Sequence, residues 1–187
     1  MDTAVNLIDR LIEADRHTPK TVFVVGDPIT DVYVYGHLDH CQDGCDKFVE
    51  EPGSRVVVAG GAANAARSLS NWSARVVFPY AGYVGATKTR FMVDGKCVFR
   101  YDDDRCRFDT VAAGERALID MWCRPDAVLI SDYDKGAMSV DFINKVVKVC
   151  AYFGVPCVAD AKREPAVYSG AIIKGNGAYV DQYCHIL

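Results

Sequence analysis

The sequence lacks any apolar run long enough to cross a membrane. Its 187 residues contain no stretch near the roughly 20 apolar residues that a spanning helix requires. The first residues also do not resemble a secretory signal peptide, because Asp9, Arg10 and Glu13 interrupt the apolar positions there. We therefore expect a cytoplasmic protein with no membrane partner.

Positive charge is scarce as well. The chain has 21 Lys and Arg residues against 25 Asp and Glu residues, which gives a formal net charge of −4. Proteins that bind nucleic acid or anionic membranes usually carry an excess of basic residues. The balance argues against both partners, whereas a small anionic ligand could still be held by a few well-placed lysines and arginines.

No secretory signal accompanies the eight cysteines, so a disulfide framework is not expected. Cys123, Cys150 and Cys157 lie within apolar patterns. In a reducing compartment such residues behave as small core side chains. We predict that all three are buried thiols.

One short segment combines imidazole and thiol side chains. His37, His40, Cys41 and Cys45 lie within nine residues, and zinc accepts such a set of ligands. The spacing fits no standard zinc finger, whose ligands usually form separated pairs. We predict no metal site, and a loop with incidental His and Cys residues is the better interpretation.

Short apolar runs that end in polar residues alternate with helical patterns along the chain. The first run is Val22–Val25, and the later ones occupy residues 127–130, 156–159 and 171–173. Helices with one apolar face are predicted at residues 4–12 and after Ser139. Short continuous apolar runs suit strands that are buried on both faces of a parallel sheet. Their alternation with helices predicts an α/β fold.

The middle of the sequence follows a different pattern. Val32–Tyr35 and Lys47–Val58 are strand-like but carry polar interruptions, and Asp94-Gly95 separates two β-prone runs. Asp-Gly in that position is a strong hairpin signal, because both turn residues tolerate positive φ. We predict one domain over residues 1–187, with a small β-layer whose strands occupy residues 32–58 and 87–104.

Four of the apolar runs end in a residue that can hydrogen-bond to a ligand. These residues are Asp27, Asp132, Asp160 and Asn176. Ligands of open parallel sheets bind outside the carboxyl ends of the strands. Several polar residues along that edge favour a hydroxyl-rich ligand, although a single strand-terminal Asp often only begins a turn or caps a helix.

Gly60 and Gly61 open a helix of small residues with Asn64 in its first turn. Free N–H groups at a helix start can bind hydroxyl or phosphate oxygens, and glycine allows a ligand to approach closely. The alternative is a tight turn into a closely packed helix. The G-x-G-x-x-G spacing of dinucleotide-binding proteins is missing.

Together these segments resemble the ribokinase-like (PfkB) carbohydrate kinases, and among them the branch that phosphorylates heptose 7-phosphate. The matching motifs, in the order of that family, are Val24-Val25-Gly26-Asp27-x-x-x-Asp31, Gly60-Gly61-Ala62-Ala63-Asn64, Ser131-Asp132-Tyr133-x-Lys135-Gly136 and Val158-x-Asp160-x-Lys162. The resemblance covers the amino-terminal half of such kinases. It implies a truncated ribokinase-like, Rossmann-like fold of three layers around a parallel sheet, with the β-layer as a lid.

The resemblance also implies a role for each matching residue. The substrate-binding residues would be Asp27, Asp31, Gly60, Gly61, Asn64 and Arg90. Those on the nucleotide and phosphate side would be Lys135, Lys162 and Asn176. Arg90 belongs to Thr87-Lys88-x-Arg90, which is similar to a basic segment suited to a sugar phosphate; the alternative is a solvated hairpin residue. ATP and Mg²⁺ are the cofactors that the resemblance implies, although this chain need bind neither.

Part of the family pattern is missing from this sequence. The Gly-Ala-Gly-Asp motif, which supplies the anion hole and the catalytic base in the family, is not found. Tyr179 stands where the family usually has a glutamate near the metal, and the segment between Tyr80 and Thr87 is short. Phosphoryl transfer depends mainly on positioning and charge stabilisation. We therefore predict no catalytic residue here, and a chain that alone is impaired as a kinase.

Three functions remain open at this point. The chain is either a kinase-derived fragment that needs a separate chain for its missing half, or a non-catalytic protein that binds a sugar or sugar phosphate. The third possibility is an interaction module that dimerises through its β-layer. An uncovered sheet edge invites association, so a homo-oligomer is expected.

Overall fold

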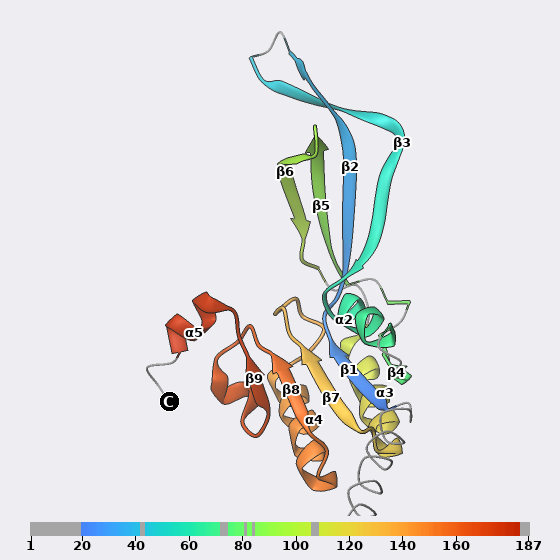
Figure 1. The fold of residues 1–187 in the computed structure, drawn as a ribbon, viewed down its shortest axis with the longest axis vertical. Helices are drawn as coiled ribbons and strands as arrows, with labels where there is room; N and C mark the ends of the chain where they lie inside the picture. Colours follow the sequence, from blue (N-terminus) through green and yellow to red (C-terminus); the bar gives the residue numbers. More distant parts are fainter. Residues whose placement is uncertain are drawn as a thin grey trace, which may run out of the picture.

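The computed structural model describes residues 20–41, 44–71, 75–80, 82–83, 85–105 and 109–183. These residues form two β-sheets, and the helices lie around only one of them (Figure 1). The other sheet projects from the first as a separate layer. The helix predicted at residues 4–12 lies outside the described residues.

The main sheet has five parallel strands in the order β4-β1-β7-β8-β9. The strand bounds are Thr21–Gly26 for β1, Arg75–Val77 for β4, Ala127–Ser131 for β7, Cys157–Asp160 for β8 and Ile172–Lys174 for β9. All four predicted apolar runs therefore fall on strands of one sheet, which confirms the α/β prediction. Strand β4 was not predicted, because it is short and begins with a charged residue.

Four helices and two 3-10 turns are found in the described part of the chain. They are α2 at Gly61–Ser70, α3 at Thr110–Asp120, η1 at Met121–Cys123, α4 at Val140–Phe153, η2 at Pro165–Tyr168 and α5 at Gly177–Tyr183. The start of α4 follows the sequence signal, since the Ser139 hydroxyl accepts the N–H of Phe142 at 3.1 Å. In the described residues, no helix has the length and apolarity to span a membrane.

Helices cover both faces of the main sheet. Val24 of β1 packs with Ala62 and Ala66 of α2 on one face. Phe23 and Val25 point to the opposite face, where they join the larger core formed with α3 and α4. Successive side chains of a strand alternate between the two faces, so β1 lies between two helical layers. The predicted three-layer fold is confirmed.

The cysteines divide between the core and the surface. Cys150 of α4 and Cys157 of β8 are 3% and 5% exposed, as predicted for core residues. The prediction for Cys123 was wrong, because this residue is exposed. It ends the 3-10 turn η1 after α3, where the chain turns toward β7, and only Met121 of that turn is buried.

The second sheet, called the lid sheet below, has four strands in the order β3-β2-β5-β6. The strands are β2 at Pro28–His40, β3 at Asp46–Gly60, β5 at Ala86–Val93 and β6 at Lys96–Asp103. Strands β2 and β5 pair in parallel and the other two pairs are antiparallel. The Asp94-Gly95 turn joins β5 to β6, and both residues have positive φ, 48° and 74°, as the hairpin signal requires.

The two faces of the lid sheet differ in chemistry. Strand register places five ionisable side chains on one face, called the charged lid face: Asp31, Lys88, Arg90, Arg100 and Asp102. The opposite face, called the apolar lid face, carries Val57, Phe91, Phe99 and Tyr101. The charged lid face turns toward the main sheet, since the Lys88 amine lies 5.2 Å from the ring centre of Tyr133, just beyond β7.

Candidate functional site

A cavity of about 380 Å³ lies between the charged lid face and the carboxyl ends of the main strands. Its lining residues come from both sheets and are Lys88, Arg100, Asp132, Tyr133, Lys135, Asp160, Ala161, Lys162, Lys174 and Asn176. Five of them are basic and two are acidic, so the local charge is opposite to the net charge of the chain. We call this the lid–sheet cavity. Such a concentration of positive charge attracts anionic ligands.

The lid contributes Lys88 and Arg100 to the cavity. Burial, with the positive charge of Arg100 nearby, lowers the pKa of Lys88. The Lys88 amine also lies over the Tyr133 ring, an arrangement in which the ring face attracts the cation. A lysine with a lowered pKa is one whose positive charge is incompletely compensated. An anion in this part of the cavity would supply the missing compensation.

The main sheet contributes a second group of cations. Lys174, at the end of β9, lies 2.9 Å from the Asp160 carboxylate at the end of β8. Lys135, in the loop after β7, contacts Asp104 at 2.5 Å, and Lys162 follows Asp160 by two residues. These lysines line one cavity because parallel strands end at the same edge of the sheet.

The structure brings together the three residues that the sequence placed on the phosphate side. Lys135, Lys162 and Asn176 all line the lid–sheet cavity. The Asn176 side-chain oxygen accepts the N–H of Tyr179 at 2.9 Å and so caps the start of α5. An amide group also has a nitrogen that donates hydrogen bonds, so capping by the oxygen and ligand contact by the nitrogen are compatible in one side chain.

Asp27 has both carboxylate oxygens turned toward the protein. One oxygen accepts the N–H of Tyr133 at 2.7 Å and the other accepts the N–H of Ala137 at 3.0 Å. The side chain is 1% exposed, and burial raises its pKa although these N–H groups oppose the shift. Asp27 therefore anchors the loop that carries Tyr133 and Lys135 to the cavity. Its contact with a sugar hydroxyl stays a prediction.

Asp31 and Arg90 contact each other on the charged lid face. The Arg90 guanidinium donates to the Asp31 carboxylate at 2.6 Å, and the two side chains are 24% and 19% exposed. Arg90 also lies over the ring of Tyr33, with its Cζ atom 5.2 Å from the ring centre. Arg90 is thus held in place by two partners and is not a freely solvated hairpin residue.

The two glycines at the start of α2 are needed for different reasons. A Cβ atom on Gly60 would lie 2.2 Å from an oxygen of Asp31, whereas Gly61 has a φ of +54° and a Cβ atom there would lie 2.5 Å from the Asp27 carbonyl oxygen. Glycine meets each of these conditions at low cost. The structure therefore places the start of α2 beside Asp31. Asn64 is exposed and accepts a hydrogen bond from Arg67 at 3.1 Å.

A buried network that sequence reasoning missed supports the same edge of the sheet. The Asp132 side chain is fully buried and accepts from Arg163 at 2.6 Å, from the Tyr168 hydroxyl and from the N–H of Asp134. Arg163 also donates to the carbonyl of Met138 at 3.1 Å. Asp132 is thus held by protein groups. Arg163 and Asp27 both fix the loop after β7, each through its own hydrogen bonds. The available signal in the sequence was Arg163, which stands three residues after the strand-terminal Asp160.

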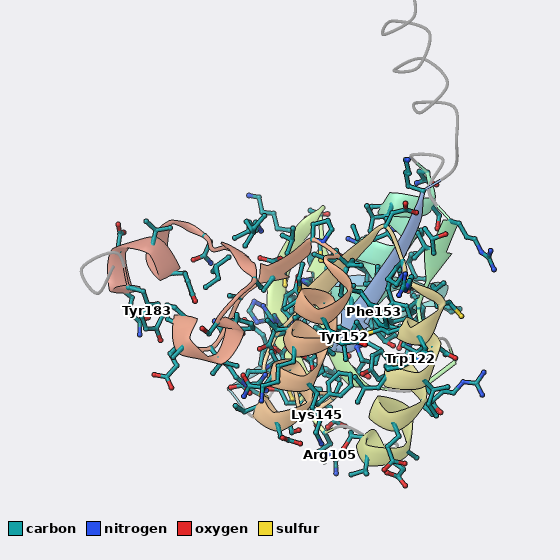
Figure 2. The ribbon with its side chains drawn as sticks, turned by 90° about the horizontal axis from the view of Figure 1, so that it is seen from below. Arg105, Trp122, Lys145, Tyr152, Phe153 and Tyr183 are labelled. Atoms are coloured by element: carbon teal, nitrogen blue, oxygen red, sulfur yellow. The ribbon has the colours of Figure 1, made fainter. Side chains whose placement is uncertain are left out.

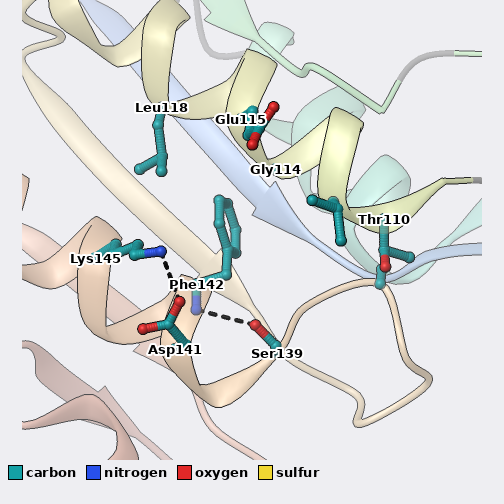
Figure 3. A pocket seen from close by; sticks show the side chains of 10 residues that line it. Thr110, Gly114, Glu115, Leu118, Ser139, Asp141, Phe142 and Lys145 are labelled. Carbon is teal, nitrogen blue, oxygen red and sulfur yellow. Dashed lines mark hydrogen bonds and ion pairs between the residues drawn. The ribbon is translucent and has the colours of Figure 1, made fainter.

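A second, smaller cavity lies between α3 and α4 (Figure 3). Its volume is about 170 Å³. Gly114 of α3 leaves room there for the ring of Phe142, and the Lys145 amine pairs with the Asp141 carboxylate at 2.7 Å. None of the residues predicted to bind a ligand lines this space. Lys135, Lys162 and Asn176 do line the lid–sheet cavity, which makes that cavity the candidate functional site.

The histidine and cysteine segment does not gather around a metal position. Over the ranges that the structure describes, no three His, Cys, Asp or Glu side chains cluster as metal ligands. His40 instead has a carboxylate neighbour, with its Nδ1 atom 3.3 Å from Asp46. This pair lies at the exposed end of the β2–β3 hairpin, far along the lid from the cavity (Figure 1).

Comparison with characterised proteins gives two kinds of similarity. No family model matches the chain. The bifunctional protein HldE of Hyphomonas neptunium is 26% identical over 190 residues, covering 84% of this chain and 39% of that protein. HldE of Methylobacillus flagellatus is 25% identical, and the alignment covers 97% of this chain and 44% of that protein. The chain thus spans about two fifths of the length of these curated relatives.

Solved structures of sugar kinases share the fold. The tetrameric inhibited form of phosphofructokinase-2 from Escherichia coli has a TM-score of 0.58 at 11% identity, covering 88% of this chain and 63% of that one. Ribokinase of Arabidopsis thaliana, complexed with ribose and ATP, has a TM-score of 0.53 at 13% identity and covers 88% of this chain and 62% of that chain. The chain therefore has a ribokinase-like fold, and its resemblance to the ribokinase-like carbohydrate kinases is confirmed over their amino-terminal part.

Proposed function

We propose that this chain forms the substrate-binding part of a carbohydrate kinase and that its ligand is a phosphorylated sugar similar to heptose 7-phosphate. The observation that carries the proposal is the lid–sheet cavity, in which five basic side chains converge at the carboxyl ends of parallel strands. A neutral sugar needs no such charge. A phosphate group does, because its two negative charges must be compensated as water is removed.

The two ends of the ligand would contact different groups: the phosphate would lie inside the lid–sheet cavity, and the sugar would extend out of it to residues that are not among the cavity lining. Sugar hydroxyls would be bound near Asp31 and the backbone of Gly60 and Gly61, where a carboxylate lies beside a helix start. The phosphate would lie between Lys88 and Arg100, which the lid sheet supplies. Arginine binds phosphate oxygens in pairs, and lysine acts as a point charge.

The cofactors fit the cavity unequally. The phosphates of ATP match the lysines at the main-sheet edge, namely Lys135, Lys162 and Lys174. Mg²⁺ needs carboxylate or other oxygen ligands, and the carboxylate of Asp160 is paired with Lys174 while that of Asp132 is held by Arg163. We propose that nucleotide phosphates can be accommodated and that the described residues provide no ready magnesium ligand set.

We further propose that these residues alone do not transfer a phosphoryl group. A general base has to lie within hydrogen-bond reach of the sugar hydroxyl and be free to take its proton. The Asp132 carboxylate is occupied by Arg163 and Tyr168, and Asp27 is occupied by backbone N–H groups. Transfer would then need groups from elsewhere, for instance from a separate chain. The alternative, a protein that binds sugar phosphate without catalysis, rests on the same cavity.

Calorimetric titration of the purified chain tests the proposal. The ligands are heptose 7-phosphate, the same sugar without phosphate, and ATP with Mg²⁺. We expect the phosphorylated sugar to bind more tightly than the free sugar, and no phosphorylated product when all are mixed. Replacing Lys88 and Arg100 by Gln should remove the preference for the phosphorylated sugar.

The matched control changes Lys47 and Arg55 of the lid to Gln. It alters the net charge equally but affects exposed side chains that are paired with Asp39 and Glu50, outside the cavity. Equal affinity for both sugars, or equal loss in the two double variants, would contradict a phosphate site between Lys88 and Arg100.

A specific observation also favours a homo-oligomer formed through the lid. Val57, Phe99 and Tyr101 of the apolar lid face are 63%, 61% and 54% exposed. Large apolar patches on soluble proteins usually mark interaction surfaces, and we propose a second copy of this chain as the partner. Sedimentation should show a dimer that Phe99→Ser with Tyr101→Ser converts to a monomer. A monomeric wild-type chain would contradict this proposal.

We also propose the cytoplasm as the compartment. Cys97 and Cys123 are exposed, free thiols. Such side chains persist where glutathione and thioredoxin keep cysteines reduced.

A further inference from the structure

A buried tyrosine contacts the loop that brings Lys162 to the lid–sheet cavity. Tyr168 ends the 3-10 turn η2 and is 0% exposed, with its ring in the core that packs against the main sheet. Tyr152 of α4, by contrast, is 78% exposed on the side of the domain opposite to the lid (Figure 2). A phenol hydroxyl at a surface can bind water, whereas a buried one needs partners from the protein. The partners of the Tyr168 hydroxyl therefore show what it holds in place.

The Tyr168 hydroxyl makes three hydrogen bonds, and together they join two loops that line the cavity. It accepts the backbone N–H of Lys162 at 3.2 Å and that of Arg163 at 3.1 Å, both in the loop after β8. It donates its proton to the carboxylate of Asp132, at the start of the loop after β7. Burial and this donated hydrogen bond raise the pKa of Tyr168, so the proton stays on the hydroxyl. One phenol thus connects the loop of Lys162 to the loop of Lys135.

The three lysines of the main-sheet edge are held in different ways. Lys174 pairs with Asp160 at 2.9 Å and Lys135 pairs with Asp104 at 2.5 Å, so a carboxylate orients each of these amines. Lys162 has no such ion-pair partner within the part of the chain that the structure describes. Its charge is therefore available to an anionic ligand. The place of its amine depends on how firmly its own backbone is held.

Arg163 also anchors this loop, but it does so through its side chain. The guanidinium donates to the carboxylates of Asp132 and Asp134, both at 2.6 Å, and to the Met138 carbonyl at 3.1 Å. Without the phenol hydroxyl the loop would stay attached to the domain by these contacts. Two of its backbone N–H groups would nevertheless lose their acceptor. Tyr168 thus fixes the backbone itself, at the residue that faces the cavity.

We propose that Tyr168 is a positioning residue for the main-sheet side of the lid–sheet cavity, where it holds the backbone of Lys162 so that the amine meets the phosphate chain of a nucleotide. The proposal deepens the proposed function and rests on it, since it takes the lysines of this edge as a phosphate site. Tyr168 is too deeply buried to contact the ligand itself. Its effect is preorganisation, because a lysine whose backbone is already fixed loses less freedom when the ligand binds.

Binding of inorganic tripolyphosphate and of heptose 7-phosphate to the full chain tests this role. Tyr168→Phe keeps the ring in the core and removes only the hydroxyl. We expect its affinity for tripolyphosphate to fall about twofold to tenfold, because the ligand then has to order the Lys162 side chain. Affinity for heptose 7-phosphate, whose phosphate is proposed to lie between Lys88 and Arg100, should stay the same. A role in folding alone would not separate two ligands of one cavity.

A double-mutant cycle with Lys162→Gln shows whether Tyr168 acts through this lysine. Lys162→Gln alone should weaken tripolyphosphate binding about tenfold to a hundredfold, the loss expected for a hydrogen bond to a charged group. In that background Tyr168→Phe should cause no further loss. The control is Ile143→Val, which removes one methyl group from a completely buried side chain of α4. It should lower stability without changing either affinity.

Hydrogen exchange of the unliganded chain gives a readout that needs no ligand. The N–H groups of Lys162 and Arg163 should be protected in the wild-type chain, because the Tyr168 hydroxyl accepts both. Tyr168→Phe should raise their exchange rates and leave those of α3 unchanged. Exchange at the rate of an exposed loop in the wild-type chain would overturn the proposal even if the variant did not fold.

The binding experiments can overturn the proposal in three further ways. These are an equal change in affinity for both ligands in Tyr168→Phe, additive losses in the double variant, and a Lys162→Gln variant that binds tripolyphosphate as tightly as the wild-type chain. If the wild-type chain binds tripolyphosphate and one of these results is found, the positioning role is wrong and the proposed function stands. If the wild-type chain binds neither ligand, the proposed function fails and the positioning role fails with it.

Discussion

The main sheet and the lid sheet use similar apolar residues for opposite purposes. Val24 and Ile130 of the main sheet are completely buried, whereas Val57 and Phe99 of the lid are more than half exposed. The helices of the described residues cover both faces of the main sheet, and none of them forms a layer on the lid (Figure 1). The difference indicates that the main sheet holds the stability of the fold. We propose that the lid supplies ligand contacts on one face and an association surface on the other.

The largest expected effect on stability comes from the buried ion pair under the main-sheet edge. Arg163→Ala should lower the free energy of unfolding by about 3–5 kcal/mol, because the fully buried Asp132 carboxylate loses its partner. Denaturant unfolding measures the change. Arg116→Ala is the control, since Arg116 forms an exposed pair with Asp120 that should contribute less than about 1 kcal/mol. If both variants lost the same unfolding free energy, the buried Arg163–Asp132 pair would contribute no more to stability than an exposed pair, which would contradict this account.

A pair of apolar substitutions tests the comparison between the sheets directly. Ile143→Ala removes a completely buried side chain from the core under the main sheet and should cost about 2–5 kcal/mol of unfolding free energy. Val57→Ala on the exposed lid face should change the same quantity by less than about 0.5 kcal/mol in the monomer. The division of roles would be wrong if the lid substitution destabilised the monomer as much as the core substitution did.

Asp31 distinguishes sugar recognition from phosphate recognition on the lid. Asp31→Ala should weaken binding of the phosphorylated and the free sugar alike, by about tenfold to a hundredfold, the range expected for losing a hydrogen bond to a charged group. Asp39→Ala, which removes an exposed lid carboxylate paired with Lys47, should have no effect. Calorimetry measures both. A loss confined to the phosphorylated sugar would place Asp31 at the phosphate end and contradict the proposed orientation.

The smallest expected effect concerns pH. In the proposed site phosphate binding would use the charged form of Lys88, and the pKa of this lysine lies below its ordinary value of 10.5. Affinity for a sugar phosphate should therefore fall as the pH rises toward 10.5. The fall should begin at a lower pH than it would with a lysine of ordinary pKa. Lys88→Arg keeps its charge at high pH and should flatten the profile. Identical profiles for the two proteins would remove Lys88 from the phosphate site.

The features that the sequence predicted are those with local signals. The apolar runs at residues 22–25 and 127–130 are recognisable as buried strands without knowledge of their neighbours, and the Asp94-Gly95 turn is specified by two adjacent residues. The same is true of α4, which has a serine cap and one apolar face. The α/β class follows from the alternation of such elements, whereas the three-layer arrangement was implied by the family resemblance.

The features that the sequence did not predict depend on distant contacts. Arg163 meets Asp132 across 31 residues, and Arg100 reaches the cavity only because β6 pairs with β5 in one register. Strand register and side-chain partners of this kind are set by packing of the whole domain. The burial of Cys123 was predicted wrongly for a related reason. An apolar pattern does not show where a helix ends in an exposed turn.

Hydrogen exchange of the chain with and without a sugar phosphate tests most directly whether a ligand binds between the two sheets. At saturating heptose 7-phosphate, β5 of the lid and the loop of residues 132–138 should gain protection together, because the ligand would contact both sides of the lid–sheet cavity. Strand β4 and helix α4 should not change. Protection of neither segment, or of only one, would contradict a phosphate ligand held jointly by the lid and the main sheet.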